Sequence, residues 1–256
     1  MPTPMRPVIV QSIYEANAVP MPLPGRMAKC PPDVVAAINA LAADCIKAGG
    51  GSRLVLSDLF RSYDMQLAAH MDYVKKRKKA FSPPPGGSLH EGGRALDLDL
   101  KALKMSLATF WPLAAKHGFT PIIDKPNANQ SEAWHFEKRG SHTAVYDFYK
   151  AGKAKNFDSP YKAMAASAIV SIGVRVDVFG DHQFEAYIQS ALIRLGQNPG
   201  GMDGAIGPRT RLALQALGIT GGSTADLVAA VDAKLQEAFP EEFFDAKASA
   251  EEHAFA

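Results

Sequence analysis

Hydrophobic and polar positions in the first 150 residues follow both helical and strand periodicities. Helical spacing of apolar residues predicts helices at 33–47, 63–79, 106–116 and 142–152. Extended, β-branched or alternating segments predict strands at 53–60, 95–100, 118–123 and 132–137. Asp33 is the expected N-cap of the first helix. Because helices and strands do not alternate strictly, the pattern favours an α+β domain over a parallel α/β fold.

The flanking segments have a different character. Residues 1–32 are rich in proline and predict an extended arm lying on the first domain. We therefore expect a first domain over 1–155 and a linker over 156–165. Beyond it, 166–235 is rich in alanine and leucine and predicts a small all-α domain. The tail, 236–256, is acidic and is expected to be flexible.

Composition narrows the class of protein. With 47% hydrophobic and 21% charged residues, the chain has the balance of a globular protein. The net charge of +2 gives no support for nucleic-acid binding, and no apolar run is long enough for a membrane span. The N-terminus lacks the apolar core of a secretory signal. Cys30 and Cys45 are expected to be buried thiols, with a bridge between them as the alternative.

One short stretch, "SLHEGGRALDLDL" at 88–100, concentrates residues that can bind a metal ion. The glycines let the chain fold back between His90 and Asp97, and Asp97 lies on the polar face of an alternating strand. Among the seven histidines, His135 alone lies within a predicted strand. A catalytic zinc site uses three His, Asp or Glu ligands, which these residues would supply. The competing interpretation is two unrelated, hydrogen-bonded histidines.

Glu132 lies three residues before His135. Zinc-assisted hydrolysis needs a carboxylate that takes a proton from water and returns it to the leaving amine, and Glu132 can fill that role. Positions i and i+3 of a regular strand face opposite sides, so Glu132 must lie in the loop before the strand or on a bulge.

The segments "SLHEGGRALD" (88–97), "EAWH" (132–135) and "FRSYDMQ" (60–66) together resemble the VanY/VanX-type zinc D-Ala-D-Ala peptidases. That group also includes lysostaphin-type peptidases and the hedgehog signalling domain. The resemblance covers about residues 53–150, with the motifs in family order. It implies one zinc ion per chain, held by His90, Asp97 and His135, with Glu132 as catalytic base.

The same resemblance implies roles for three further residues. Arg61 would lie near the scissile carbonyl, where a guanidinium stabilises the negative charge of the transition state. Ser88 and Gln66 would contact the substrate, although Ser88 is equally well explained as a turn hydroxyl. The basic run at 75–79 is expected to be a solvated helix end that favours an anionic cell-wall surface, with nucleic-acid binding as the alternative.

A second resemblance covers 184–217 and points to the small helical peptidoglycan-binding domain. Its two signatures appear in order, carried by Gln189, Leu192, Leu195, Gly196, Asp203, Gly204, Gly207, Pro208 and Thr210. The glycine-rich turn lacks the further acidic ligands and terminal Glu of a calcium loop. Together the resemblances imply an α+β domain, with a small antiparallel sheet and flanking helices holding zinc, followed by an all-α wall-binding domain.

The expected function is therefore a zinc peptidase that cuts peptidoglycan stem peptides. It would be either a D-Ala-D-Ala carboxypeptidase or an endopeptidase of the L-Ala-D-Glu type. We expect a monomer that is made in the cytoplasm and reaches the wall by a holin-type or dedicated export route, as a phage endolysin or an exported effector would. The catalytic domain is expected to cleave small soluble peptides without the wall-binding domain. The alternative is a non-catalytic peptidoglycan-binding protein with a vestigial zinc site.

Overall fold

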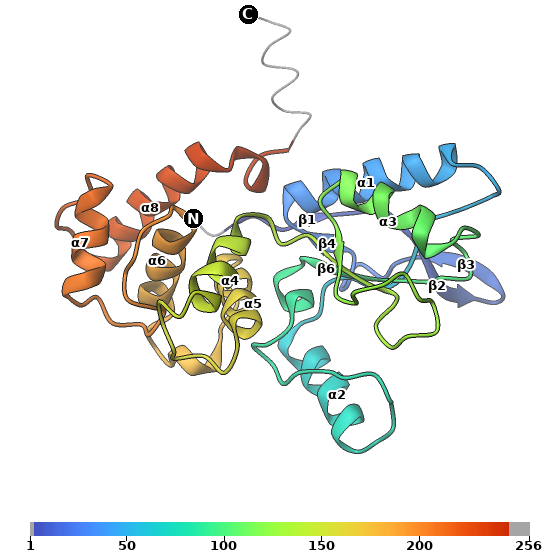
Figure 1. The fold of residues 1–256 in the computed structure, drawn as a ribbon, viewed down its shortest axis with the longest axis horizontal. Coiled ribbons are helices and arrows are strands. Elements are labelled where there is room, and N and C mark those ends of the chain that lie inside the picture. Colours follow the sequence, from blue (N-terminus) through green and yellow to red (C-terminus); the bar gives the residue numbers. More distant parts are fainter. Residues whose placement is uncertain (1–2, 246–256) are drawn as a thin grey trace, which may run out of the picture.

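The computed structural model describes residues 3–245, which form a sheet half (3–139) and a helical half (140–245) (Figure 1). The α-helices are α1 (Pro32–Lys47), α2 (Tyr63–Val74), α3 (Leu107–Lys116), α4 (Thr143–Lys150), α5 (Pro160–Ser171), α6 (Gln183–Arg194), α7 (Pro208–Ala216) and α8 (Thr224–Ala238). The strands are β1 (Arg6–Pro7), β2 (Gln11–Ala16), β3 (Val19–Pro22), β4 (Lys29–Cys30), β5 (Val55–Asp58), β6 (Ala95–Leu98), β7 (Thr120–Pro121) and β8 (His135–Glu137). Short 3-10 helices are η1 (Leu89–Gly92), η2 (Gly140–His142), η3 (Asp177–Phe179) and η4 (Pro240–Glu242).

The predicted combination of helices and strands is confirmed, but the main sheet is mixed rather than purely antiparallel. Its strand order is β3-β2-β5-β6-β8-β7, and β2 runs parallel to β5 while the other pairs are antiparallel. The N-terminal arm is extended as expected. It forms β1 to β4, adding a hairpin to the main sheet and building the separate antiparallel pair β1-β4.

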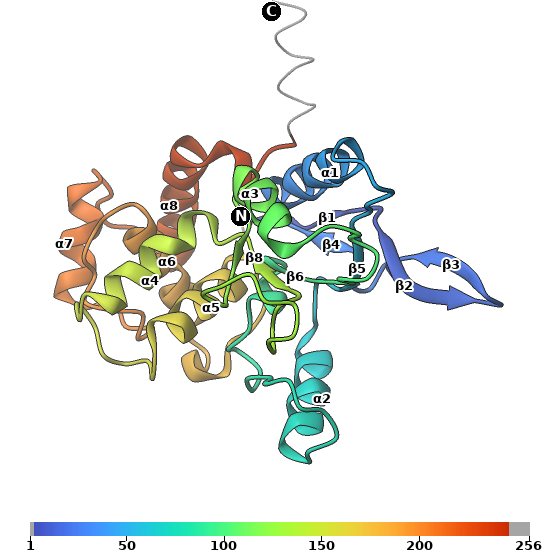
Figure 2. The ribbon, with the colours of Figure 1, turned by 45° about the vertical axis from the view of Figure 1, so that its right-hand side comes forward.

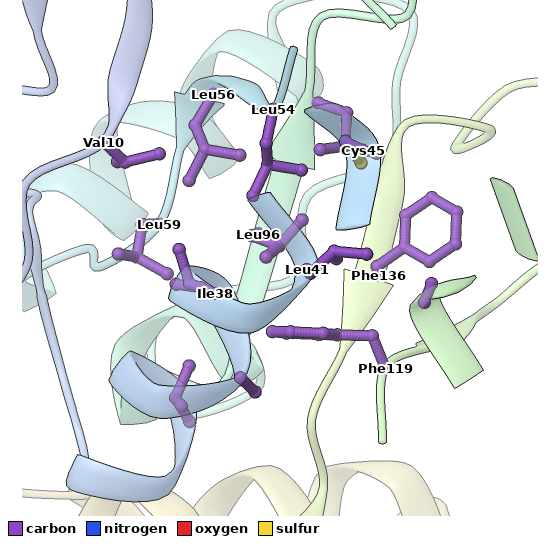
Figure 3. Close-up of a cluster of buried hydrophobic side chains, with 14 of the residues drawn as sticks. Val10, Ile38, Leu41, Cys45, Leu54, Leu56, Leu59, Leu96, Phe119 and Phe136 are labelled. Atoms are coloured by element: carbon purple, nitrogen blue, oxygen red, sulfur yellow. The ribbon is translucent and has the colours of Figure 1, made fainter. Parts of the chain in front are cut away.

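The core of the sheet half lies between the main sheet and the pair of helices α1 and α3 (Figures 1 and 2). The apolar faces of the two helices pack onto alternate residues of β5, β6 and β8. Figure 3 shows Ile38 and Leu41 of α1 facing Leu56 and Leu96 of the sheet. Cys45 lies in this core, and both cysteines are buried free thiols, so the alternative of a bridge is excluded.

The helical half has its own core, to which α4 to α8 all contribute. Helix α4 was expected to complete the first domain, yet Val145 and Phe148 pack into this second core. Helix α5 begins at Pro160, inside the expected linker, because Ser159 caps its N-terminus by accepting a hydrogen bond from the Lys162 N–H.

Four of the signature residues, Gln189 of α6 with Asp203, Gly204 and Thr210, form one hydrogen-bonded cluster. The side-chain oxygen of Gln189 accepts from the N–H groups of Asp203 and Gly204, at 2.9 Å each. Its nitrogen donates to the Asp203 carboxylate at 2.6 Å and approaches the Thr210 hydroxyl at 3.4 Å. The spacing of these residues is therefore explained by the need to fix the loop between α6 and α7.

The two halves meet where α5 packs against η1. Met164 and Ala168 of α5 share a small buried cluster with Leu89 and Ala95 of the sheet half. The approach is close at Gly92, where an added Cβ would lie 2.8 Å from the Ala168 Cβ. A chain ending at residue 155 would lack α5 and leave the apolar side of η1 uncovered.

A buried ion network also joins the halves. Arg94 binds Asp33 at 3.0 Å and Glu242 at 3.2 Å, and Glu242 also binds Arg194 at 2.7 Å. The structure thus differs from the expected flexible tail over 236–245, where α8 continues to Ala238 and η4 places Glu242 between two arginines. Residues 246–256 of that tail lie outside the described residues.

Asp33 is not the N-cap of α1. That position is Pro31, and the Asp33 carboxylate binds Arg94 instead. Across residues 3–245, none of the helices combines the length and the apolar character needed to cross a membrane.

Candidate metal centre

Three adjacent elements bring His90, Asp97 and His135 together. The antiparallel pairing of β6 with β8 places Asp97 directly opposite His135. His90 lies on η1, which ends at Gly93 in the left-handed conformation (φ 65°) and so turns the chain into β6. Strand β6 is buried at all four positions, so the polar face expected for it is inside the protein.

The ligand atoms of these three residues converge. The Asp97 Oδ1 atom lies 2.9 Å from His135 Nδ1 and 3.3 Å from His90 Nε2. All three donor atoms lie within 4.8 Å of one another, and all three side chains are buried. This group can therefore hold a metal ion.

Each histidine is oriented by its other ring nitrogen. His90 Nδ1 lies 2.7 Å from the backbone carbonyl oxygen of Leu59, to which it donates. His135 Nε2 lies 3.4 Å from Glu137 Oε1. With those nitrogens protonated, His90 Nε2 and His135 Nδ1 keep their lone pairs for an ion.

Without a metal ion, the cluster favours an ionised carboxylate on Asp97 and a protonated ring on His135. Burial would raise the pKa of Asp97, but His90 and His135 hold it well below the ordinary value. Burial would lower the pKa of His135, but hydrogen bonds and charges from Asp97 and Glu137 raise it to about 10. In the absence of a metal ion, His135 is therefore protonated at neutral pH.

Glu132 lies in the turn before β8, as the strand geometry required. Its backbone has φ 68°, a left-handed value that is uncommon outside glycine, and its carbonyl accepts from the His135 N–H at 3.0 Å. The Oε1 atom is buried without a hydrogen-bond partner among the described residues. Burial raises the pKa of this carboxyl, and His135 opposes the shift.

Arg61 lies between β5 and α2, with its guanidinium held on three sides. It donates to Asp58 at 2.6 Å, to Gln66 at 3.2 Å and to Asp97 at 3.2 Å. Its charge remains fixed, since Asp58 and Asp97 raise its pKa against the opposing effect of burial. The side chain reaches the wall of the cavity that contains the three metal-binding residues.

Gln66 and Ser88, predicted to contact substrate, occupy different positions. Gln66 is fully buried and donates to the Pro83 carbonyl at 2.6 Å, so it lies behind Arg61 and holds the 82–83 loop. Ser88 caps η1 by accepting from the His90 N–H at 3.3 Å, as a turn hydroxyl would. It also lines the cavity.

Comparison with protein-family models and with curated proteins found no match for this chain. The function of this protein is therefore inferred from the geometry of the site and from the motifs in the sequence.

The cavity beside these residues has a volume of about 680 Å³. The three metal-binding residues, Arg61 and Glu132 line it together with residues of the 80–88 loop and of the segment 121–124. The helical half contributes Tyr146, Tyr161 and Lys162 to the lining. A cavity of this size accommodates several residues of an extended peptide.

The sequence did not predict the roles that four residues have beside the site. Asp58 binds Arg61, Glu137 lies behind His135, and Tyr161 donates to Glu137. Lys78 lines the cavity and is half-buried, unlike its neighbours in the basic run. Only the role of Glu137 could have been suggested by the sequence, because Glu137 lies two residues after His135. The roles of the other three residues depend on tertiary contacts.

Proposed function

We propose that this protein is a zinc-dependent peptidase that hydrolyses amide bonds in peptidoglycan stem peptides. The observation that carries the proposal is the convergence of His90, Asp97 and His135 beside Glu132, whose buried Oε1 has no described partner, in one peptide-sized cavity. Two imidazole nitrogens and one carboxylate oxygen form the donor set of a catalytic zinc site with an open position.

The three ligands would hold zinc, which when bound would supply Lewis acidity toward the peptide carbonyl and the attacking water. Glu132 accepts a proton from that water as the oxygen bonds to the carbonyl carbon. The same carboxyl then delivers the proton to the amine nitrogen as the C–N bond breaks. The raised pKa of Glu132 suits an exchange of this kind.

Arg61 stabilises the negative charge that develops on the carbonyl oxygen. Its hydrogen bonds to Asp58, Gln66 and Asp97 fix the guanidinium before substrate arrives, so little reorganisation is needed during the reaction. A non-catalytic wall-binding protein has no need for a proton-accepting carboxylate and a fixed cation in one cavity. We therefore favour catalysis over a vestigial site.

The choice of peptidoglycan as substrate is supported by the motifs in both halves of the chain. The segments at 60–66, 88–97 and 132–135 resemble wall peptidases, and 184–217 resembles a wall-binding domain. A peptidase domain and a binding domain that recognise the same polymer would serve one function in one chain.

The test is to digest purified peptidoglycan sacculi with the zinc-loaded protein and to measure the product masses. Release of free D-Ala would identify a carboxypeptidase, and new internal amino termini would identify an endopeptidase. A chelator should stop the reaction and added zinc should restore it. If zinc-loaded protein releases no peptide product, the proposed function is wrong.

A further inference from the structure

The side chain of Tyr161 connects the helical half to the metal centre. It extends from the first turn of α5, and its hydroxyl donates to Glu137 Oε1 at 2.7 Å. The backbone N–H of Leu89, the residue before His90, interacts with the same hydroxyl. One phenol group thus touches the segments that carry two of the three metal-binding residues.

Glu137 is the link between this hydroxyl and His135. Its carboxylate is completely buried. Oε2 accepts from Arg139 Nε at 2.7 Å, while Oε1 accepts from Tyr161 and lies 3.4 Å from His135 Nε2. The hydrogen bond from Tyr161 therefore helps to fix the position of Oε1, which is the acceptor available to the His135 imidazole.

The orientation of His135 matters because only one of its nitrogens faces Asp97 and the ion position. Nδ1 can donate its lone pair to a metal only when the proton resides on Nε2, and Glu137 is the acceptor that keeps it there. Removal of such an outer hydrogen-bond partner typically weakens metal binding by about 10–100-fold.

We propose that Tyr161 is a positioning residue for the metal centre, acting through Glu137 on His135, so that a side chain of the helical half sets the affinity of the sheet half for its metal ion. The inference rests on the proposed metal site and extends it, because it makes the helical half part of the metal-binding unit. The close packing of α5 on η1 at Gly92 keeps the hydroxyl in place.

The test is zinc affinity, measured by competition with a chromophoric chelator on full-length protein. Tyr161→Phe keeps the ring and its packing but removes the hydroxyl, and it should bind zinc about 10–100-fold more weakly than wild type. Tyr146→Phe is the matched control. Tyr146 packs in the same cluster and lines the same cavity, but its hydroxyl forms no hydrogen bond among the described residues, so its affinity should stay within about twofold.

A double-mutant cycle distinguishes a positioning role of Tyr161 from a general loosening of the protein structure around it. If the hydroxyl acts through Glu137, then Tyr161→Phe combined with Glu137→Leu, which removes the shared acceptor, should weaken zinc binding no more than Glu137→Leu alone. The thermal midpoints of the metal-free variants show whether the fold itself has changed. Fully additive losses, or wild-type affinity in Tyr161→Phe, would overturn the inference while leaving the zinc site intact. Failure of wild-type protein to bind one zinc ion would instead overturn the proposed function, and the inference with it.

Discussion

Each histidine of the candidate metal centre uses one ring nitrogen for the ion position and the other for a hydrogen bond to the protein. His90 donates to the Leu59 carbonyl and His135 to Glu137. These contacts orient both rings, and Asp97 lies between the two inward-facing nitrogens. The site is therefore organised in the metal-free protein, and its affinity for zinc should depend on the proton that His135 carries.

Zinc affinity should rise with pH. In metal-free protein the pKa of His135 is about 10, so below that pH an ion must displace one proton from this ring. The apparent association constant should then increase about tenfold per pH unit between roughly pH 6 and 8.5. Competition titrations, corrected for protonation of the chelator, measure this slope. A slope of zero across that range would show that His135 is not protonated in the metal-free protein.

Lys78 should select substrates that carry a carboxylate near the scissile bond. Its ammonium group lines the cavity close to Arg61 and Glu132, and it forms no ion pair among the described residues. Lys78→Ala should raise KM about tenfold for a peptide with a free carboxylate and have little effect on its amidated analogue. Lys79, the exposed neighbour, provides the control variant Lys79→Ala. An equal effect of Lys78→Ala on both peptides would exclude carboxylate recognition.

For single helices and strands, the hydrophobic periodicity of the sequence was enough to predict the element where only one of its faces is buried. Helix α3 lies within the predicted segment 106–116, and strands were found within the segments at 53–60 and 132–137. The exceptions arise from tertiary contacts. Asp97 can be buried because His90, His135 and Arg61 contact its carboxylate, a set of contacts that a local pattern does not encode. Likewise, the parallel pairing of β2 with β5 depends on how a proline-rich arm folds back.

The motifs located the candidate ligands and Glu132, because the spacing of such residues in the chain is itself informative. They did not reveal Gln66 as a buried support for Arg61. Nor did they reveal that Tyr161, beyond the expected boundary at 155, reaches the site. Contacts between distant elements decide both positions.

The contact between η1 and α5 should be intolerant of even one added methyl group. Gly92→Ala would place a Cβ 2.8 Å from the Ala168 Cβ and 3.1 Å from its backbone carbonyl carbon. Overpacking of this kind typically destabilises a protein by about 1–3 kcal/mol. Gly25→Ala, where an added Cβ meets nothing within 4 Å, is the control. Urea unfolding gives both values, and equal midpoints for the two variants would show that the junction can relax.

Across the whole molecule, the two halves are connected by packing, by an ion network and by the hydrogen bond from Tyr161 to Glu137 behind the candidate metal centre. Helix α5 packs against η1, and η4 lies against α1. Figures 1 and 2 show α5 beside the sheet half. The helical half therefore helps to form the cavity beside the candidate metal centre. Near the C-terminal end of the described chain, Glu242 binds an arginine from each half.

Loss of Glu242 should destabilise the entire protein. Glu242→Ala would leave Arg94 with Asp33 as its only carboxylate partner among the described residues and would remove the anionic partner of Arg194, in a region where all these side chains are buried. Breaking a buried pair from one side typically costs about 3–5 kcal/mol. Glu241 is exposed, and Glu241→Ala should change the unfolding free energy by less than about 0.5 kcal/mol. Indistinguishable unfolding curves for the two variants would contradict the role given to this network.

The central claim is that His90, Asp97 and His135 hold a zinc ion with which Glu132 performs peptide hydrolysis. The most direct measurement is the zinc content and kcat of Glu132→Gln, determined on one sample beside wild type. Glutamine keeps the shape of the side chain but cannot accept a proton at neutral pH. The account predicts one zinc ion per chain in both proteins and a kcat lowered about 10²–10⁴-fold or more in the variant. A Glu132→Gln protein that keeps its zinc and turns over substrate at the wild-type rate would contradict it.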